Sequence, residues 1–125
     1  MSQQALKILH KMQLISSNSP YVFPSNIHVN KPMNSQTVNA ALKRAGYTGK
    51  LVSHGLRSIA STAANESGKF NSDIIEAALS HTDKNTIRSS YNRSDYFEQR
   101  KELMQWWADF VFDDLNYPYN EMLLI

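Results

Sequence analysis

The chain has 125 residues, of which 42% are hydrophobic and 19% charged, with four glycines, four prolines and no cysteine. This composition fits one globular domain or part of one, favours helix, and excludes a disulfide framework and a thiolate metal site. No apolar run approaches the roughly 18 residues of a membrane span, and no secretory signal opens the chain, so a cytoplasmic protein is expected.

Charge is divided unevenly between the two halves of the sequence. Residues 1–65 carry seven Lys or Arg side chains and no Asp or Glu, whereas residues 66–125 carry six basic and eleven acidic side chains. The first half is therefore +7 and the second −5. Small helical domains can have such asymmetry by chance, but it is also expected where one part of a protein faces a polyanion. Nucleic-acid binding is one candidate function.

The first half predicts helices separated by a long loop. Apolar residues at helical spacing predict a helix over 3–15, with Ser2 as its cap. Residues 16–34 are rich in Ser, Asn and Pro and predict a connecting loop, with at most a short β piece near residues 21–23. A second helix is predicted over 35–45, capped by Asn34 or Ser35 and ended by Gly46. Its expected inner face is Val38, Ala41, Leu42 and Ala45.

The second half predicts three clear helices. One spans 54–67, between a Ser53 cap and Gly68, and another spans 72–80, capped by Asn71 or Ser72. A weakly marked helix is possible near 84–90. The last helix spans 95–113, capped by Ser94. Its repeating apolar residues are Leu103, Met104, Trp107, Phe110 and Val111. The expected fold is a mainly α, compact bundle of about five helices.

Residues 114–125 form a C-terminal tail that ends in four apolar residues, Met122 to Ile125. A free apolar tail is unfavourable in water. It is expected to pack on its own domain or, alternatively, to dock in trans on a neighbouring protomer.

Three short segments hold the residues that could carry chemistry. His54 and Arg57 lie three apart at the start of one predicted helix and share a face. His81 lies at a predicted helix end, and Tyr91 follows it by ten residues, just before Asn92-Arg93. Each residue alone has an ordinary structural interpretation: a partly buried histidine, a surface arginine, a helix-capping histidine and a half-buried tyrosine.

Together these segments resemble the catalytic end of tyrosine recombinases, the phage integrase family, most closely the prophage and genomic-island integrases. The resemblance runs from about residue 3 to residue 112 and rests on several long segments in the same order and spacing. These segments are SPYVFPS, TVNAALKRAGY, HGLRSIASTAANE, IIEAALSH and RSSYNRSDYFEQRKELMQWWADFV. It implies site-specific DNA recombination, in integration and excision, by strand cleavage and rejoining.

The resemblance also implies a role for each residue. Tyr91 would attack the scissile phosphate and form a 3′-phosphotyrosyl intermediate. Arg57 and His81 would bind the phosphate, and His54 would accept or donate a proton, as histidine does near neutral pH. Tyr96, five residues on, is the rival nucleophile, but the family places the nucleophile before Asn-Arg. No cofactor or metal is expected, because no carboxylate or cysteine pattern accompanies the histidines.

The implied partners are a double-stranded DNA attachment site and further copies of the protein, in a recombination tetramer. The protein would be nucleoid-associated when bound, and no membrane is expected. The candidate DNA-binding residues are Lys43, Arg44, Lys50 and Arg88.

The chain departs from the family at its front, because the family's first catalytic arginine and its lysine precede the SPYVFPS segment and have no counterpart here. Residues 1–113 are accordingly interpreted as a partial integrase catalytic domain. Loss of one charge stabiliser typically costs about 10²–10³ in rate, so the chain alone is expected not to cleave DNA. The alternative function is that of a non-catalytic DNA-binding or oligomerisation fragment.

Overall fold

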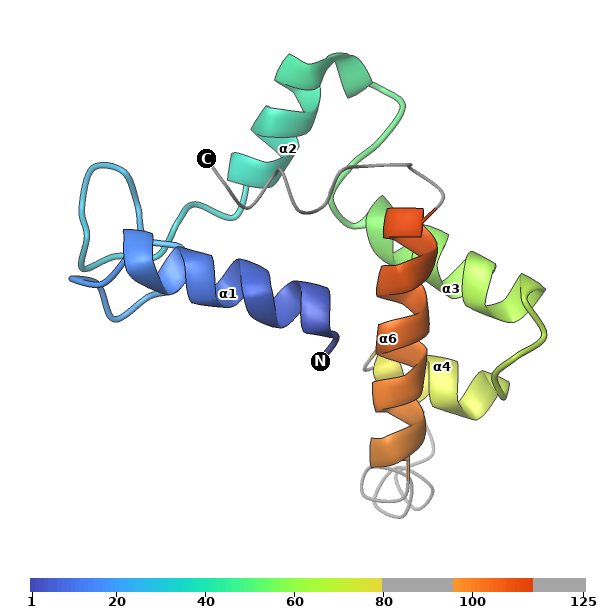
Figure 1. Cartoon of the computed structure of the whole chain (residues 1–125). Helices are drawn as coiled ribbons and strands as arrows, with labels where there is room; N and C mark the ends of the chain where they lie inside the picture. Colours follow the sequence, from blue (N-terminus) through green and yellow to red (C-terminus); the bar gives the residue numbers. More distant parts are fainter. Residues whose placement is uncertain (80–95, 114–125) are drawn as a thin grey trace, which may run out of the picture. The chain divides into compact units, whose positions relative to one another are not determined.

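A computed structural model describes residues 1–79 and 96–113, and these residues are mainly helical, as predicted (Figure 1). The chain divides into two units. One comprises Gln4–Leu56, and the other comprises Met1–Gln3 together with Arg57–Ile125. The elements are α1 (Gln3–Ile15), α2 (Thr37–Leu42), the π-helical segment η1 (Lys43–Tyr47), α3 (Gly55–Glu66), α4 (Ser72–Ala78) and α6 (Phe97–Asp113). None of the described helices is long and apolar enough to cross a membrane.

The unit Gln4–Leu56 opens with α1, whose predicted bounds are confirmed. The predicted loop follows it. Residues 21–23, where a short β piece was expected, form a bend, and an isolated antiparallel bridge joins Pro24 and Pro32 directly after them. Two backbone hydrogen bonds flank the bridge, from Met33 N–H to the Phe23 carbonyl at 2.8 Å and from Ser25 N–H to the Lys31 carbonyl at 2.9 Å. Because proline has no N–H to donate, pairing does not extend into a ladder.

The second predicted helix is displaced by two residues from its expected range of 35–45, because α2 begins at Thr37 and continues into η1, which ends at Tyr47. Asn34 supports its start, since its side-chain oxygen accepts from Gln36 N–H at 2.8 Å. Gly46, the predicted stop, lies inside η1 with φ of 88°, a conformation that glycine adopts without a Cβ clash. The predicted inner face of this helix is wrong: Val38, Ala41 and Ala45 are exposed and Leu42 is half-buried.

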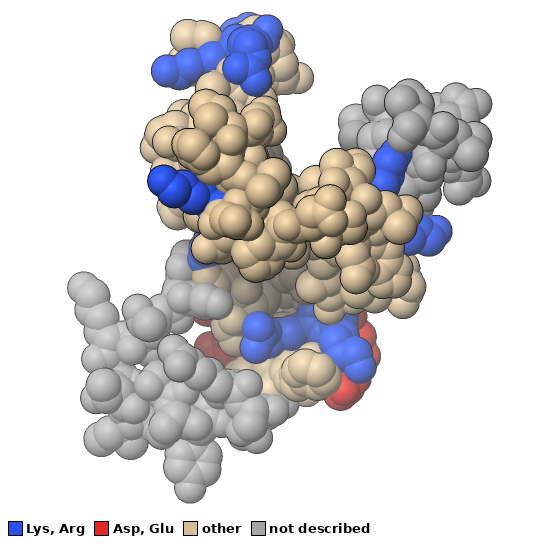
Figure 2. Space-filling model, turned by 90° about the vertical axis from the view of Figure 1, so that its left-hand side faces the viewer, with Lys and Arg blue, Asp and Glu red and all other residues tan. Residues whose placement is uncertain are grey.

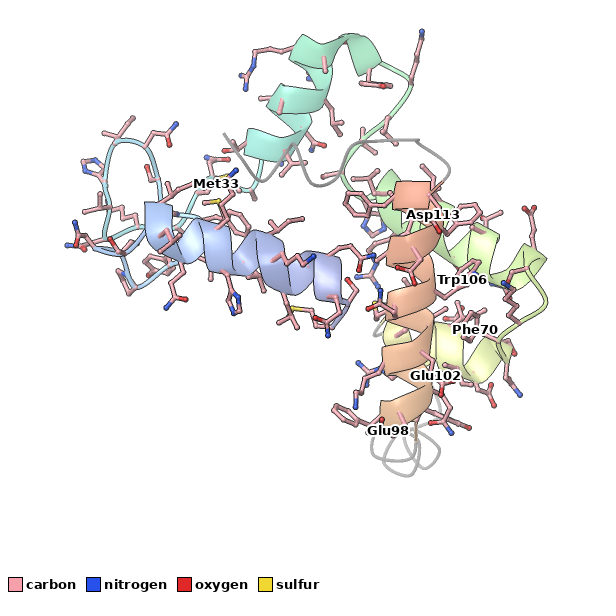
Figure 3. All side chains as sticks on the ribbon, viewed as in Figure 1. Met33, Phe70, Glu98, Glu102, Trp106 and Asp113 are labelled. Atoms are coloured by element: carbon pink, nitrogen blue, oxygen red, sulfur yellow. The ribbon has the colours of Figure 1, made fainter. Side chains whose placement is uncertain are left out.

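The hydrophobic core of the described residues lies in the other unit. Ala64 of α3, Ile75 of α4 and Leu103 of α6 form one cluster and are 2%, 1% and 3% exposed. Ala108 of α6 is also buried. The half-buried apolar residues packed against the cluster are Phe70, Ile74, Ala78, Leu79, Met104 and Trp106. The Phe70 and Trp106 rings lie 5.4 Å apart between centroids (Figure 3). Trp106 therefore joins this core, where the sequence pattern had indicated Trp107.

Local signals account for the ends of these helices. Gly68, the predicted stop after α3, has φ of 64°. Asn71, one of the two predicted caps of α4, accepts a hydrogen bond from Asp73 N–H at 2.9 Å. The helix near 84–90, the Ser94 cap and the tail 114–125 lie outside the described residues.

Candidate functional site

Arg57 lies in the first turn of α3 with its side chain exposed. Its Nη2 group donates a hydrogen bond to the main-chain carbonyl of Leu79, directly after α4. The Leu79 N–H in turn donates to the Ile75 carbonyl at 3.0 Å, so Leu79 closes the helix. Carbonyls at a helix C-terminus lack helical partners and attract cations. The guanidinium therefore caps α4 and is held in position by it.

This hydrogen bond leaves most of the guanidinium fork for another ligand. A guanidinium has five N–H donors in one plane, and only one of them is needed for the Leu79 carbonyl. A phosphate or carboxylate can accept two parallel hydrogen bonds from such a group. The sequence pattern identified Arg57 but gave no sign of Leu79, whose contribution is a backbone carbonyl and does not depend on side-chain type.

His54 directly precedes α3 and is exposed. The chain before it is held by two hydrogen bonds. Ser53 N–H donates to the side-chain oxygen of Asn39 in α2 at 2.8 Å. Gly55 N–H donates to the Val52 carbonyl at 2.9 Å. The sequence analysis did not identify this contact, because Asn39 lies 14 residues from Ser53 and carries no motif of its own.

Three of the four predicted DNA-binding residues are described, and all three are exposed. Lys43 and Arg44 belong to η1, and Lys50 follows it. Figure 2 shows basic side chains, and no acidic ones, gathered at this end of their unit. Tyr47 in the same segment is 47% exposed. A basic surface of this kind can bind an anionic polymer.

Tyr96 lies just before α6 and is half-buried. Its carbonyl accepts a hydrogen bond from Arg100 N–H at 2.9 Å, so the residue helps to begin the helix. His81, Arg88 and Tyr91 lie outside the described residues. Over residues 1–79 and 96–113, no three His, Asp or Glu side chains are grouped as a metal site.

The comparisons with known protein sequences all identify the same family. The sequence profile of the phage integrase family matches residues 1–98. Prophage integrase IntA of Escherichia coli K12 is 65% identical over 111 residues, which are 89% of this chain and 27% of that protein. The integrase of Enterobacteria phage P4 is 38% identical over 119 residues, 93% of this chain and 27% of that integrase. Prophage integrase IntZ of E. coli K12 is 39% identical over 111 residues, 89% of this chain and 27% of that protein.

No solved structure matches the chain. The chain spans about a quarter of the length of these relatives. The matched residues include both His54 and Arg57 and the segment with His81 and Tyr91. Because the family profile covers most of the chain and the relatives align with nearly all of it, the chain belongs to the phage integrase family.

Proposed function

We propose that this region supplies the nucleophile and part of the phosphate-binding site of a site-specific DNA recombinase that integrates and excises a prophage or genomic island. The Tyr91 oxygen attacks the scissile phosphorus, and the bond to the 5′ oxygen breaks. The 3′ phosphate becomes linked to Tyr91, whose hydroxyl gives up its proton, and the 5′ oxygen takes up a proton and leaves as a hydroxyl. Because the phosphodiester energy is kept in the new bond, a second 5′ hydroxyl can reverse the step.

The observation that carries this proposal is the hydrogen bond between Arg57 and the Leu79 carbonyl. Leu79 stands two residues before His81 in the sequence. The bond thus connects Arg57 to the segment that leads to His81. The family resemblance implies that Arg57 and His81 bind the same phosphate, and this connection supports their belonging to one site.

Each residue has a chemical task in this reaction. Negative charge on the non-bridging phosphate oxygens is stabilised by the Arg57 fork and by a hydrogen bond from His81. His54 accepts or donates a proton near the reacting oxygens. No metal or cofactor takes part in the proposed reaction.

DNA binding is proposed for the basic surface of η1 and its flank. Lys43, Arg44 and Lys50 would contact phosphates of a double-stranded attachment site, and Arg88 would do so from the segment before Tyr91. Further copies would complete a recombination tetramer, with the tail 114–125 docking on a neighbouring protomer and residues 1–113 forming part of the catalytic domain.

The test is covalent trapping on a nicked suicide substrate. One protein is the chain alone, and the other is a chimera in which this region replaces the matching 111 residues of the E. coli prophage integrase IntA. We expect a denaturation-resistant DNA adduct with the chimera and none with the chain alone. Absence of adduct from the chimera, when the unaltered E. coli protein gives one, would contradict the proposal.

The second candidate function is a non-catalytic DNA-binding or oligomerisation fragment. The basic surface around η1 favours it, because electrostatic binding does not require the catalytic residues. Salt-sensitive DNA binding by the chain alone, together with an inactive chimera, would support this alternative.

A further inference from the structure

His54 belongs to a four-residue turn that directly precedes the first full turn of α3. Gly55 N–H donates to the Val52 carbonyl at 2.9 Å, which closes the turn around Ser53 and His54. The closing bond uses the first carbonyl and the last N–H of the turn, so the Ser53 N–H has no partner inside it. A main-chain N–H that finds no partner lowers stability. An acceptor from outside the turn is therefore needed at Ser53.

Asn39 of α2 supplies that acceptor. Its Oδ1 atom accepts the hydrogen bond from Ser53 N–H at 2.8 Å, across 14 positions of the sequence. Both residues belong to the unit Gln4–Leu56, so the contact lies within one unit. The bond that closes the turn is local, whereas the bond to Asn39 joins the turn to a helix. The main chain immediately before His54 is therefore held by α2.

The Asn39 amide group is itself oriented by a second hydrogen bond. Its Nδ2 group donates to Oε1 of Gln36, the residue before α2, at 3.1 Å. Gln36 is held in turn, because its N–H donates to the Asn34 side chain at 2.8 Å and its carbonyl accepts from Ala40 N–H at 2.9 Å. A side-chain amide has one acceptor and one donor group, and here each has a partner. The amide thus presents its oxygen to the turn.

We propose that Asn39 is a positioning residue for His54 in the strand-cleavage reaction: it fixes the main chain from which the imidazole projects. The inference rests on the proposed function for the part that His54 takes in proton transfer. A proton is transferred between groups that lie within hydrogen-bond reach of each other. Because histidine has a short side chain, a shift of its main chain moves the ring by a similar distance. A misplacement of about 1 Å can reduce a rate about a hundredfold.

Three substitutions isolate the acceptor oxygen of Asn39. Asn39→Ala removes the oxygen, and α2 should stay formed because alanine favours helix more than asparagine does. Asn39→Asp keeps an oxygen that can accept from Ser53 N–H. Asn65→Ala is the matched control: it also removes a helical asparagine, whose Nδ2 group donates to the Ser61 carbonyl at 2.8 Å, but in α3. A specific role of the Asn39 oxygen predicts an effect of the first substitution alone.

Hydrogen exchange in the 125-residue chain measures the anchoring of the turn without DNA. We expect the Ser53 amide to exchange about threefold to tenfold faster in Asn39→Ala, the effect of losing one neutral hydrogen bond, and at nearly the parental rate in the other two variants. The Leu79 amide, which donates to the Ile75 carbonyl in the other unit, is the internal reference. An unchanged rate at Ser53 would overturn the proposal. Equal acceleration at Ser53 and Leu79 would assign Asn39 to overall folding and would overturn it as well.

The rate of adduct formation on the nicked substrate, measured with the chimera described above, tests the positioning. Asn39→Ala should lower the rate about tenfold to a hundredfold, Asn39→Asp should restore most of it, and Asn65→Ala should leave it unchanged. In a His54→Gln background, Asn39→Ala should cause no further loss, because it acts through His54. An equal further loss in that background, or a rate for the Asp variant as low as for the Ala variant, would contradict the proposal.

The positioning and the recombinase function fail in different measurements. If the unaltered chimera forms no adduct, the function is contradicted and the positioning for that reaction falls with it, while the exchange rate of Ser53 separately decides whether Asn39 holds the turn. If the unaltered chimera forms the adduct and its Asn39→Ala variant forms it at the same rate, the function stands and the positioning is overturned.

Discussion

The guanidinium of Arg57 and the carbonyl of Leu79 are joined by a hydrogen bond, although the two residues are 22 positions apart. The bond connects the first turn of α3 to the end of α4, and it holds a charged group at the surface in one place. A phosphate ligand would thus meet an arginine whose orientation is already restricted. Restricting a group before binding reduces the entropy lost when the ligand arrives.

Replacement of Arg57 by Ala should lower the free energy of unfolding as well as phosphate binding. The Leu79 carbonyl would lose its partner, at a cost of about 0.5–1.5 kcal/mol. Urea unfolding of the chain measures this change. Ser58→Ala, an exposed substitution in the same turn of α3, should change stability by less than about 0.5 kcal/mol. Equal stability of the Arg57 variant and the parent would show that the bond contributes nothing.

Ile75→Ala should be strongly destabilising, by about 2–5 kcal/mol, because Ile75 is 1% exposed and its truncation leaves a cavity among α3, α4 and α6. Ile59→Ala removes the same atoms from a residue that is 48% exposed, and should cost well under half as much. Denaturant unfolding of both variants checks the difference. Similar losses at the two positions would contradict the core described above.

The Asn71 cap gives a third prediction. Its side chain accepts from Asp73 N–H, so Asn71→Ala should destabilise the chain by about 1 kcal/mol. Asn71→Asp keeps an acceptor at the helix N-terminus and should retain most of the stability. Thermal unfolding of the two variants compares them directly, and a loss as large for Asp as for Ala would exclude capping as the cause.

Tyr91→Phe in the chimera should abolish the covalent DNA adduct, because the variant has no hydroxyl to attack phosphorus. Tyr96→Phe should retain the adduct, since Tyr96 is half-buried at the start of α6 and the nucleophile is expected at the tyrosine before Asn92-Arg93. Trapping on the nicked substrate measures both. The opposite pattern would move the nucleophile to Tyr96.

Salt dependence tests the basic surface at η1. Each of Lys43→Ala, Arg44→Ala and Lys50→Ala should reduce the slope of log affinity against log salt by about 0.9, if each side chain contacts one phosphate. Lys101→Ala is the control, because Lys101 forms an ion pair with Glu98 at 2.8 Å in the acidic half of the chain. An unchanged slope in all three η1 variants would remove this surface from the DNA interface.

The periodic spacing of apolar residues predicted the helices of this protein well where capping and stop residues mark the same helix ends. The bounds of α1, the Gly68 stop and the Asn71 cap all follow from residue types within a few positions. Burial was predicted less well, because it depends on what packs against a helix. Val38 has the spacing of an inward-facing residue, yet it is 40% exposed within a unit that has no core. Trp106 packs on Phe70, which lies between α3 and α4, and the position of Phe70 cannot be read from the apolar spacing within α6.

The candidate site shows the same division between local pattern and tertiary contact. Arg57 and His54 could be identified from one short motif. The contributions of Leu79 and Asn39 could not, because a backbone carbonyl has no sequence signature and a lone asparagine in a helix indicates no particular partner.

The packing of Ile75 in α4 against Leu103 in α6 has a consequence for the segment between these helices, residues 80–95, which contains His81 and Tyr91. One core anchors both ends of that segment. Because the two anchors share one core, a substitution that weakens this core loosens both ends of the segment together.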